Sequence, residues 1–156
     1  MIPLAVTVNG TRHDLEVEPN VTLLELLRGP LHLAGAKEGC GVGECGTCLV
    51  LLDGEPVTSC LVLAADAEGR VVETIEGLAR DGVLDAVQDA FVERGAIQCG
   101  YCTPAMVLAA EALLRESPHP ERPEIAEALA GVLCRCGSYP RVLNAVAAAA
   151  AKGVAR

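Results

Sequence analysis

The chain has 156 residues, of which 51% are hydrophobic and 21% are charged, a composition typical of a packed globular protein with one domain or two small ones. Its formal charge of -9 and its three aromatic residues argue against nucleic acid as a partner, because that ligand needs basic and aromatic surfaces. No apolar run approaches ~18 residues and no basic segment leads into one at the start, so we expect no membrane insertion, no export signal and a cytoplasmic location.

The first 76 residues carry the two-residue alternation of β-strands. Apolar side chains alternate over 4–8 and again over 15–17, and Asn9-Gly10 between them favours a tight hairpin turn. The segment 22–28 has the apolar spacing of a short helix, which Gly29-Pro30 ends. Further strands are expected at 49–52, around Val57, and at 71–72. Residues 1–76 are therefore predicted to form a sheet of about four strands crossed by one helix, the outline of a ferredoxin-like β-grasp.

From residue 77 onward the apolar period changes from two to about 3.6, the period of an amphipathic helix. Four segments follow this pattern: 83–91, 104–115, 125–133 and 142–150. The alanine run 147–151 is far too short to span a membrane, which favours close helix packing. Residues 77–156 are therefore predicted to form a four-helix bundle-like domain, and the whole chain an α+β protein of two domains.

Eight cysteines in two sets of four are the most informative feature of the sequence. The first set is Cys40, Cys45, Cys48 and Cys60, and the second is Cys99, Cys102, Cys134 and Cys136. Without a secretory segment, disulfides are not the favoured interpretation. The first spacing, C-x4-C-x2-C-x11-C, is the plant-type ferredoxin arrangement for a [2Fe-2S] cluster, whereas zinc knuckles usually present C-x2-4-C twice.

Glycines surround the first three cysteines. Four of the eight residues from 39 to 46 are glycine, which allows positive φ and a close approach of backbone N–H groups to a compact anion. A disulfide loop does not need this freedom. A two-iron cluster is therefore the preferred interpretation of the first set, with zinc and disulfides as the alternatives.

The second set, C-x2-C-x31-C-x-C, leaves zinc as a serious alternative when spacing alone is considered. Pro104 and Pro140 closely follow the two cysteine pairs, and proline is favoured in the first turn of a helix. Each pair is therefore predicted to lie just before a helix, with Thr103 as the N-cap of the first one, so that positive helix ends face an anionic site. The three histidines lie outside both sets, which argues against a Rieske centre or a mixed cysteine-histidine zinc site.

Three strings, EGCGVGECGTC at 38–48, QCGYCTPAM at 98–106 and LCRC at 133–136, resemble the small iron-sulfur subunit of the molybdenum hydroxylases, the family of xanthine dehydrogenase and aldehyde oxidase. The resemblance covers nearly the whole chain, in order, with both cysteine sets at matching spacings. The chain departs from the family at Ala105, where glycine is frequent, and at Gly137-Ser138, where Thr-Gly is common. Both departures lie beside the second cysteine set.

The resemblance implies an electron relay without catalytic residues of its own. Both cysteine sets would hold [2Fe-2S] clusters, the second next to a molybdopterin-type cofactor on a large partner subunit and the first nearer an FAD-binding subunit or another acceptor. Gln98 and Cys136 match the family residues that reach the pterin. The alternatives are a free-standing two-cluster ferredoxin-like carrier and a two-zinc adaptor.

Overall fold

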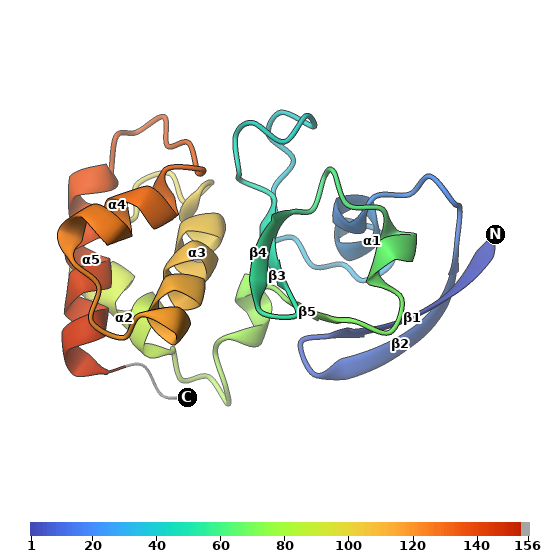
Figure 1. Cartoon of the computed structure of the whole chain (residues 1–156), viewed down its shortest axis with the longest axis horizontal. Coiled ribbons are helices and arrows are strands. Elements are labelled where there is room, and N and C mark those ends of the chain that lie inside the picture. Colours follow the sequence, from blue (N-terminus) through green and yellow to red (C-terminus); the bar gives the residue numbers. More distant parts are fainter. Residues whose placement is uncertain (154–156) are drawn as a thin grey trace.

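The computed structural model describes residues 1–153, which form two parts lying side by side (Figure 1). The sheet part comes first in the described chain and has five strands in the order β2-β1-β5-β3-β4. Its elements are β1 (Ile2–Val8), β2 (Thr11–Val17), α1 (Leu23–Arg28), β3 (Leu49–Leu52), β4 (Glu55–Thr58) and β5 (Val71–Glu73), with the 3-10 turns η1 (Ala64–Ala67) and η2 (Ile75–Gly77). The helical part follows, with α2 (Ala86–Glu93), α3 (Thr103–Glu116), α4 (Arg122–Leu129) and α5 (Tyr139–Lys152). The predicted α+β class and the order of its two parts are confirmed.

The hairpin of β1 and β2 opens the sheet, as Asn9-Gly10 predicts. Both turn residues have positive φ, 49° and 79°, as the tight hairpin turn requires. β1 also pairs in parallel with β5, and β3 pairs antiparallel with both β5 and β4. Val50, Leu51 and Leu52 of β3 are all buried, which explains why this inner strand is continuously apolar rather than alternating.

The predicted short helix is α1, which begins after Thr22. The Thr22 side chain accepts the Glu25 N–H while the Glu25 carboxylate accepts the Thr22 N–H, a reciprocal capping box. All four leucines of α1 are buried in one cluster with the inward-facing side chains of β1. Burial of this apolar face, more than the propensity of six residues, holds so short a helix in place.

The start of α2 differs from the prediction, which placed Val83 and Leu84 on its apolar face. Asp85 is the N-cap and accepts the N–H groups of Val87 and Gln88 at 2.8 Å each. Val83 and Leu84 therefore precede the helix, and they are 70% and 45% exposed. The helix starts later than the apolar periodicity indicates because Asp85, a good capping residue, lies inside the periodic run.

The ends of the other helices next to the cysteines also differ in detail. The predicted N-cap Thr103 is the first helical residue instead, because the Cys102 carbonyl already accepts the Met106 N–H. α4 ends at Leu129, and Leu133 is 58% exposed rather than part of the predicted helical face. The Leu133 N–H donates to the Cys45 carbonyl oxygen of the sheet part instead of continuing the helix.

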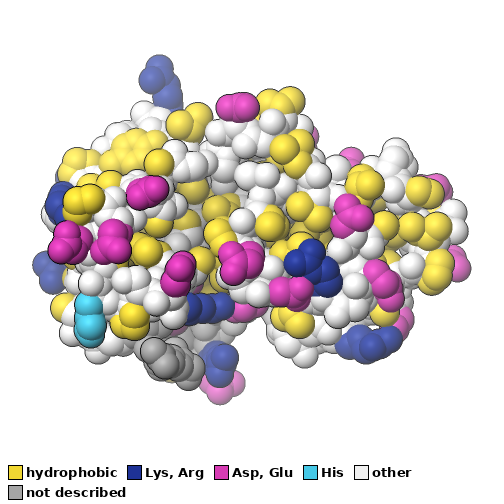
Figure 2. Space-filling view, in the orientation of Figure 1, with side chains coloured by type: hydrophobic (Ala, Val, Ile, Leu, Met, Phe, Trp, Pro, Cys, Tyr) yellow, Lys and Arg dark blue, Asp and Glu magenta, His cyan; other side chains and the backbone are white. Residues whose placement is uncertain are grey.

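Each part has its own cluster of buried hydrophobic side chains, and α3 lies at the junction between them. α3 packs against β3 and β4, and Arg115 near its end forms a bidentate ion pair with Glu73 of β5, with both N···O distances 2.9 Å. The alanines Ala149 and Ala150 of α5 are buried, as close packing predicts. Acidic side chains are spread over both parts (Figure 2). No helix in residues 1–153 combines the length and apolarity that crossing a bilayer requires.

Candidate iron-sulfur centres

The first cysteine set lies where the loop 39–48 enters the sheet. Cys48 immediately precedes β3 and Cys60 follows β4 by two residues, so the antiparallel pairing of these strands brings both to the same end of the hairpin. The Cys48 thiol lies close enough to Cys60 for the two to influence each other's protonation. Cys40 and Cys45 interact at the tip of the loop, where the Cys45 N–H donates to the Cys40 sulfur at 3.4 Å. The first set therefore consists of two pairs of neighbouring thiols.

The second cysteine set lies at one tip of the helical part, as predicted. Cys99 and Cys102 come just before α3, and Cys134 and Cys136 just before α5. Cys102 neighbours Cys134, and Cys99 neighbours Cys136. Cys102 is buried, whereas Cys99 and Cys136 are exposed. The second set thus repeats the arrangement of two thiol pairs, with one pair at the surface.

The paired arrangement fits a two-iron cluster. Four cysteine thiolates hold the two irons of a [2Fe-2S] cluster, so each iron takes one pair, whereas a zinc tetrathiolate gathers all four around one ion. The donor set of soft thiols and its division into pairs therefore suit two [2Fe-2S] clusters.

Backbone amides favour the thiolate at the loop tip of the first site. The N–H groups of Val42 and Cys45 each donate to the Cys40 sulfur at 3.4 Å. These two hydrogen bonds lower the pKa of the Cys40 thiol to about 7. N–H groups that stabilise a thiolate also stabilise the anionic cluster that it binds, and hydrogen bonds of this kind set cluster potential.

The same effect operates at the start of α5. Burial acts to raise the pKa of Cys134, but hydrogen bonds from the Ser138 N–H and the Cys102 side chain outweigh it, and the pKa is lowered. Ser138 is the N-cap of α5, so the predicted role of this helix end is supported. By contrast, burial raises the pKa of Cys48 to about 11 and that of Cys102 to about 12. The two buried thiols therefore need the charge of a bound metal to lose their protons near neutral pH.

Two glycines of the first loop are required by close contacts. A Cβ atom on Gly39 would lie 2.7 Å from the Cys45 sulfur and 2.7 Å from the Thr47 hydroxyl oxygen. Gly46 has a φ of +68°, and a Cβ atom there would lie 2.0 Å from the carbonyl oxygen of Gly131 in the helical part. The expected positive φ is confirmed at Gly46, and both glycines lie at close contacts; the approach of this loop's backbone to a bound cluster stays a prediction.

Two hydrogen bonds connect the cysteine loops of the two parts. The Leu133 N–H donates to the Cys45 carbonyl oxygen at 2.9 Å, and the Tyr101 hydroxyl donates to the Glu38 carbonyl oxygen at 2.7 Å. Leu133 directly precedes Cys134 in the sequence. One peptide-to-peptide hydrogen bond therefore separates a cysteine of the first set from the residue next to a cysteine of the second.

Gln98 bridges the two loops of the second set. Its side-chain nitrogen donates to the Ser138 hydroxyl at 3.0 Å and, more weakly, to the Cys136 carbonyl oxygen at 3.4 Å. Gln98, Cys99 and Cys136 are all exposed. They form the exposed edge of the second site, a surface that spacing alone does not predict.

Tyr139 has a positioning role that the sequence analysis did not assign. Its hydroxyl oxygen accepts the Cys134 N–H at 2.7 Å and its O–H donates to the Val132 carbonyl oxygen at 3.1 Å. The chain contains only two tyrosines, and each lies within three residues of a cysteine of the second set. That proximity in a chain so poor in aromatic residues was the available signal.

Comparison with known protein families defines the class of protein. Residues 6–79 match the family described as 2Fe-2S iron-sulfur cluster binding domain, and residues 74–147 match the [2Fe-2S] binding domain family. The two matches cover both cysteine sets. They define a protein with two [2Fe-2S] clusters, whose chemistry is electron transfer.

Two relatives and one solved structure narrow the class to a family. The chain is 46% identical over 145 residues to the nicotinate dehydrogenase small FeS subunit of Eubacterium barkeri, covering 93% of this chain and 92% of the relative. It is 47% identical over 148 residues to the xanthine dehydrogenase iron-sulfur-binding subunit of Escherichia coli O157:H7, again covering 93% and 92%. A chain of quinoline 2-oxidoreductase from Pseudomonas putida 86 is similar with a TM-score of 0.93 and 42% identity, over 96% of this chain and 94% of that one.

The chain belongs to the small [2Fe-2S] iron-sulfur subunits of the molybdenum hydroxylase family, that of xanthine dehydrogenase and aldehyde oxidase. It is an electron-transfer subunit of an oxidoreductase. The expected resemblance is confirmed, and neither the free-standing carrier nor the two-zinc adaptor is favoured.

Proposed function

We propose that this chain carries electrons from a molybdopterin-type cofactor on a large partner subunit to an FAD-binding subunit or another acceptor, with residues 1–76 and 77–156 as its two cluster-binding domains. One cluster is held by Cys40, Cys45, Cys48 and Cys60, and the other by Cys99, Cys102, Cys134 and Cys136. When bound, each [2Fe-2S] cluster accepts and releases one electron. The second site faces the large subunit and the first faces the FAD-binding subunit.

The hydrogen bond between the two cysteine loops carries this proposal. The Cys45 carbonyl oxygen accepts the Leu133 N–H at 2.9 Å, although the two parts have separate hydrophobic cores. The close packing of Gly46 on Gly131 holds the loops at this distance. This hydrogen bond favours a relay between the two sites rather than two independent centres. It joins the expected ligand Cys45 to Leu133, the residue before the expected ligand Cys134.

The exposed edge of the second site supports a partner on that side. Cys99 and Cys136 are exposed in this chain, and exposed thiols are vulnerable to oxidation unless another surface covers them. Gln98, held by the Ser138 hydroxyl at 3.0 Å, offers a fixed amide at the same edge. We assign Gln98 and Cys136 to contact with the pterin of the large subunit.

Two cysteine variants of the purified complex test the ligand sets. After anaerobic reduction, the wild-type complex should show two distinguishable paramagnetic signals from the clusters of this chain. Cys45→Ser should remove one signal and Cys134→Ser the other, because each site binds its own cluster. Loss of both signals in either variant, or of neither, would contradict the assignment.

The composition of the native complex tests the partners. Purified from its own host, the chain should be accompanied by a large molybdenum-containing subunit and by a subunit that binds FAD. A monodisperse monomer with both clusters would favour a free-standing carrier. Two zinc ions per chain without iron or acid-labile sulfide would favour the adaptor.

A further inference from the structure

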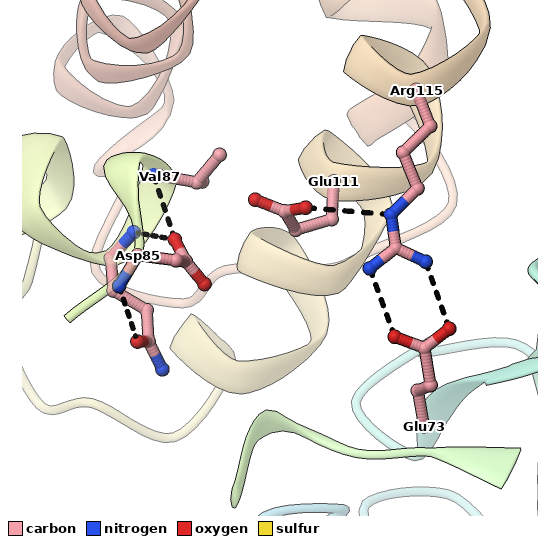
Figure 3. Close-up of polar contacts among 6 residues, drawn as sticks. Glu73, Asp85, Val87, Glu111 and Arg115 are labelled. Carbon is pink, nitrogen blue, oxygen red and sulfur yellow. Dashed lines mark hydrogen bonds and ion pairs between the residues drawn. The ribbon is translucent and has the colours of Figure 1, made fainter. Parts of the chain in front are cut away.

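A carboxylate that neither cysteine site uses is buried in the middle of α3. Glu111 is 3% exposed, and its Oε1 atom has no hydrogen-bond partner among residues 1–153. The Oδ2 atom of Asp85, which lies just before α2, is buried and also without a partner in that range. Figure 3 shows the Glu111 carboxylate between Asp85 on one side and Arg115 on the other. Two unpaired acceptors in one buried place require an explanation.

The neighbouring charges are already committed to other partners. Asp85 Oδ1 accepts the N–H groups of Val87 and Gln88 at 2.8 Å each, which fixes the Asp85 carboxylate as a cap. The Arg115 guanidinium donates to both oxygens of Glu73 at 2.9 Å, and its Nε lies 3.6 Å from Glu111 Oε2. The positive charge nearest to Glu111 is therefore that of Arg115, which lies 3.6 Å away and is shared with Glu73.

The charges around Glu111 leave an excess of one negative charge. Glu111 and Asp85 line a cavity of about 390 Å³ together with Glu73 of β5 and with Arg80 and Arg115. Within the described residues, these are the charged side chains that line it. Three carboxylates thus face two guanidinium groups, and one added positive charge makes the cluster neutral.

We propose that Glu111 is a proton-binding site beside Asp85, in which the buried and unpartnered Oε1 atom of Glu111 carries the proton. The proton removes the excess charge of the cluster and leaves no ionised carboxylate at the buried Glu111 position. The proton is assigned to Glu111 because its Oε1 atom has no hydrogen-bond partner among residues 1–153, whereas two backbone N–H groups already hold Asp85 as a helix cap.

The titration behaviour of the buried carboxyl agrees with this geometry. Burial, and after it the charge of Asp85, raise the pKa of Glu111 from 4.5 to about 7 against the lowering effect of Arg115. Because the folded-state pKa lies above the unfolded value, the site stabilises the fold fully below about pH 4.5 and loses that contribution as the pH rises through about 7. The unfolding equilibrium constant should rise on the order of a hundredfold across this range.

The position of the site links proton uptake to the junction between the two parts. Arg115 lies between Glu111 of the helical part and Glu73 of the sheet part. Loss of the proton makes Glu111 a competitor for the guanidinium that binds Glu73 and a repulsive neighbour of Asp85. Protonation should therefore tighten the contacts of α3 with β5 and with the start of α2.

Infrared spectroscopy of the full chain with its clusters tests the proposal. The wild type should show a protonated-carboxyl C=O band that disappears with a midpoint near pH 7, and the exposed-site control Glu116→Gln should show the same band. Glu111→Gln should lack the band and lose the decline in thermal stability between pH 6 and 8. Asp85→Asn, which preserves a capping residue, should move the midpoint to lower pH.

Three results would overturn the proton assignment. They are the absence of any band titrating near neutral pH in the wild type, its persistence in Glu111→Gln, and an unmoved midpoint in Asp85→Asn. The wild-type midpoint pH could instead depend on which cation, sodium, potassium or magnesium, is present at constant ionic strength. That result would assign the site to a cation.

Discussion

The substitution Gly46→Ala tests whether the contact between the two cysteine loops matters to the relay. Gly46 has a φ of +68°, and its added Cβ would lie 2.0 Å from the Gly131 carbonyl oxygen, where ordinary contacts begin at 3.4 Å. Backbone atoms cannot rotate away as a side chain does, so the two loops must separate by more than 1 Å. The adjacent Leu133 N–H to Cys45 bond, now 2.9 Å, would then exceed the length of a hydrogen bond.

The matched control is Gly69→Ala. Gly69 has a φ of +70°, and a Cβ atom there meets nothing within 4 Å. Both variants therefore bear the same left-handed backbone strain, roughly 1–2 kcal/mol. Gly46→Ala also loses the hydrogen bond between the loops, about 1 kcal/mol more, which corresponds to an additional fall of about 2–4 °C in the unfolding temperature.

The assay combines calorimetry at one scan rate with electron paramagnetic resonance of the reduced protein. Both variants should retain both clusters. Gly46→Ala should unfold at a lower temperature than Gly69→Ala, and its two signals should show weaker magnetic interaction and slower electron exchange. Equal unfolding temperatures and unchanged interaction between the signals in Gly46→Ala would refute the idea that this contact couples the sites.

Two further substitutions examine groups that position the ligands. Tyr139→Phe leaves the Cys134 N–H and the Val132 carbonyl oxygen without their hydroxyl partner, which should lower stability by about 1–3 kcal/mol. A chelator should then remove the second cluster faster than in the wild type and the first cluster at an unchanged rate. Equal acceleration at both sites would count against this positioning role. Ser59 is fully buried and donates to the Cys48 carbonyl oxygen at 2.6 Å, so Ser59→Ala should lower stability by about 1 kcal/mol, measured by calorimetry. No change in stability would mean that this hydrogen bond is dispensable.

Local patterns were sufficient to predict the parts of the fold that depend on neighbours in sequence. Asn9-Gly10 specified its hairpin because the turn needs positive φ at both residues. The first cysteine spacing indicated its cluster because three of the four expected ligands lie within one loop. The helix at 22–28 followed from its spacing of leucines.

Features that depend on distant contacts could not be read from the sequence. Leu133 fits the apolar period of α4, yet its N–H bonds to Cys45, 88 positions earlier in the chain. The charged neighbours of Glu111 come from β5, from α3 itself and from the residue before α2, and no spacing rule brings them together. Nothing in a periodic apolar segment indicates that one of its polar residues is buried against another acid.

The electron capacity of the chain tests the central claim most directly. A stoichiometric reductive titration of the anaerobically purified protein, normalised to chain concentration and followed by visible absorbance and paramagnetic resonance, counts the electrons that its centres accept. Two one-electron [2Fe-2S] sites predict uptake of about two electrons per chain, with two signals appearing. Uptake of one electron or none by a preparation with its full iron content would contradict a two-cluster relay.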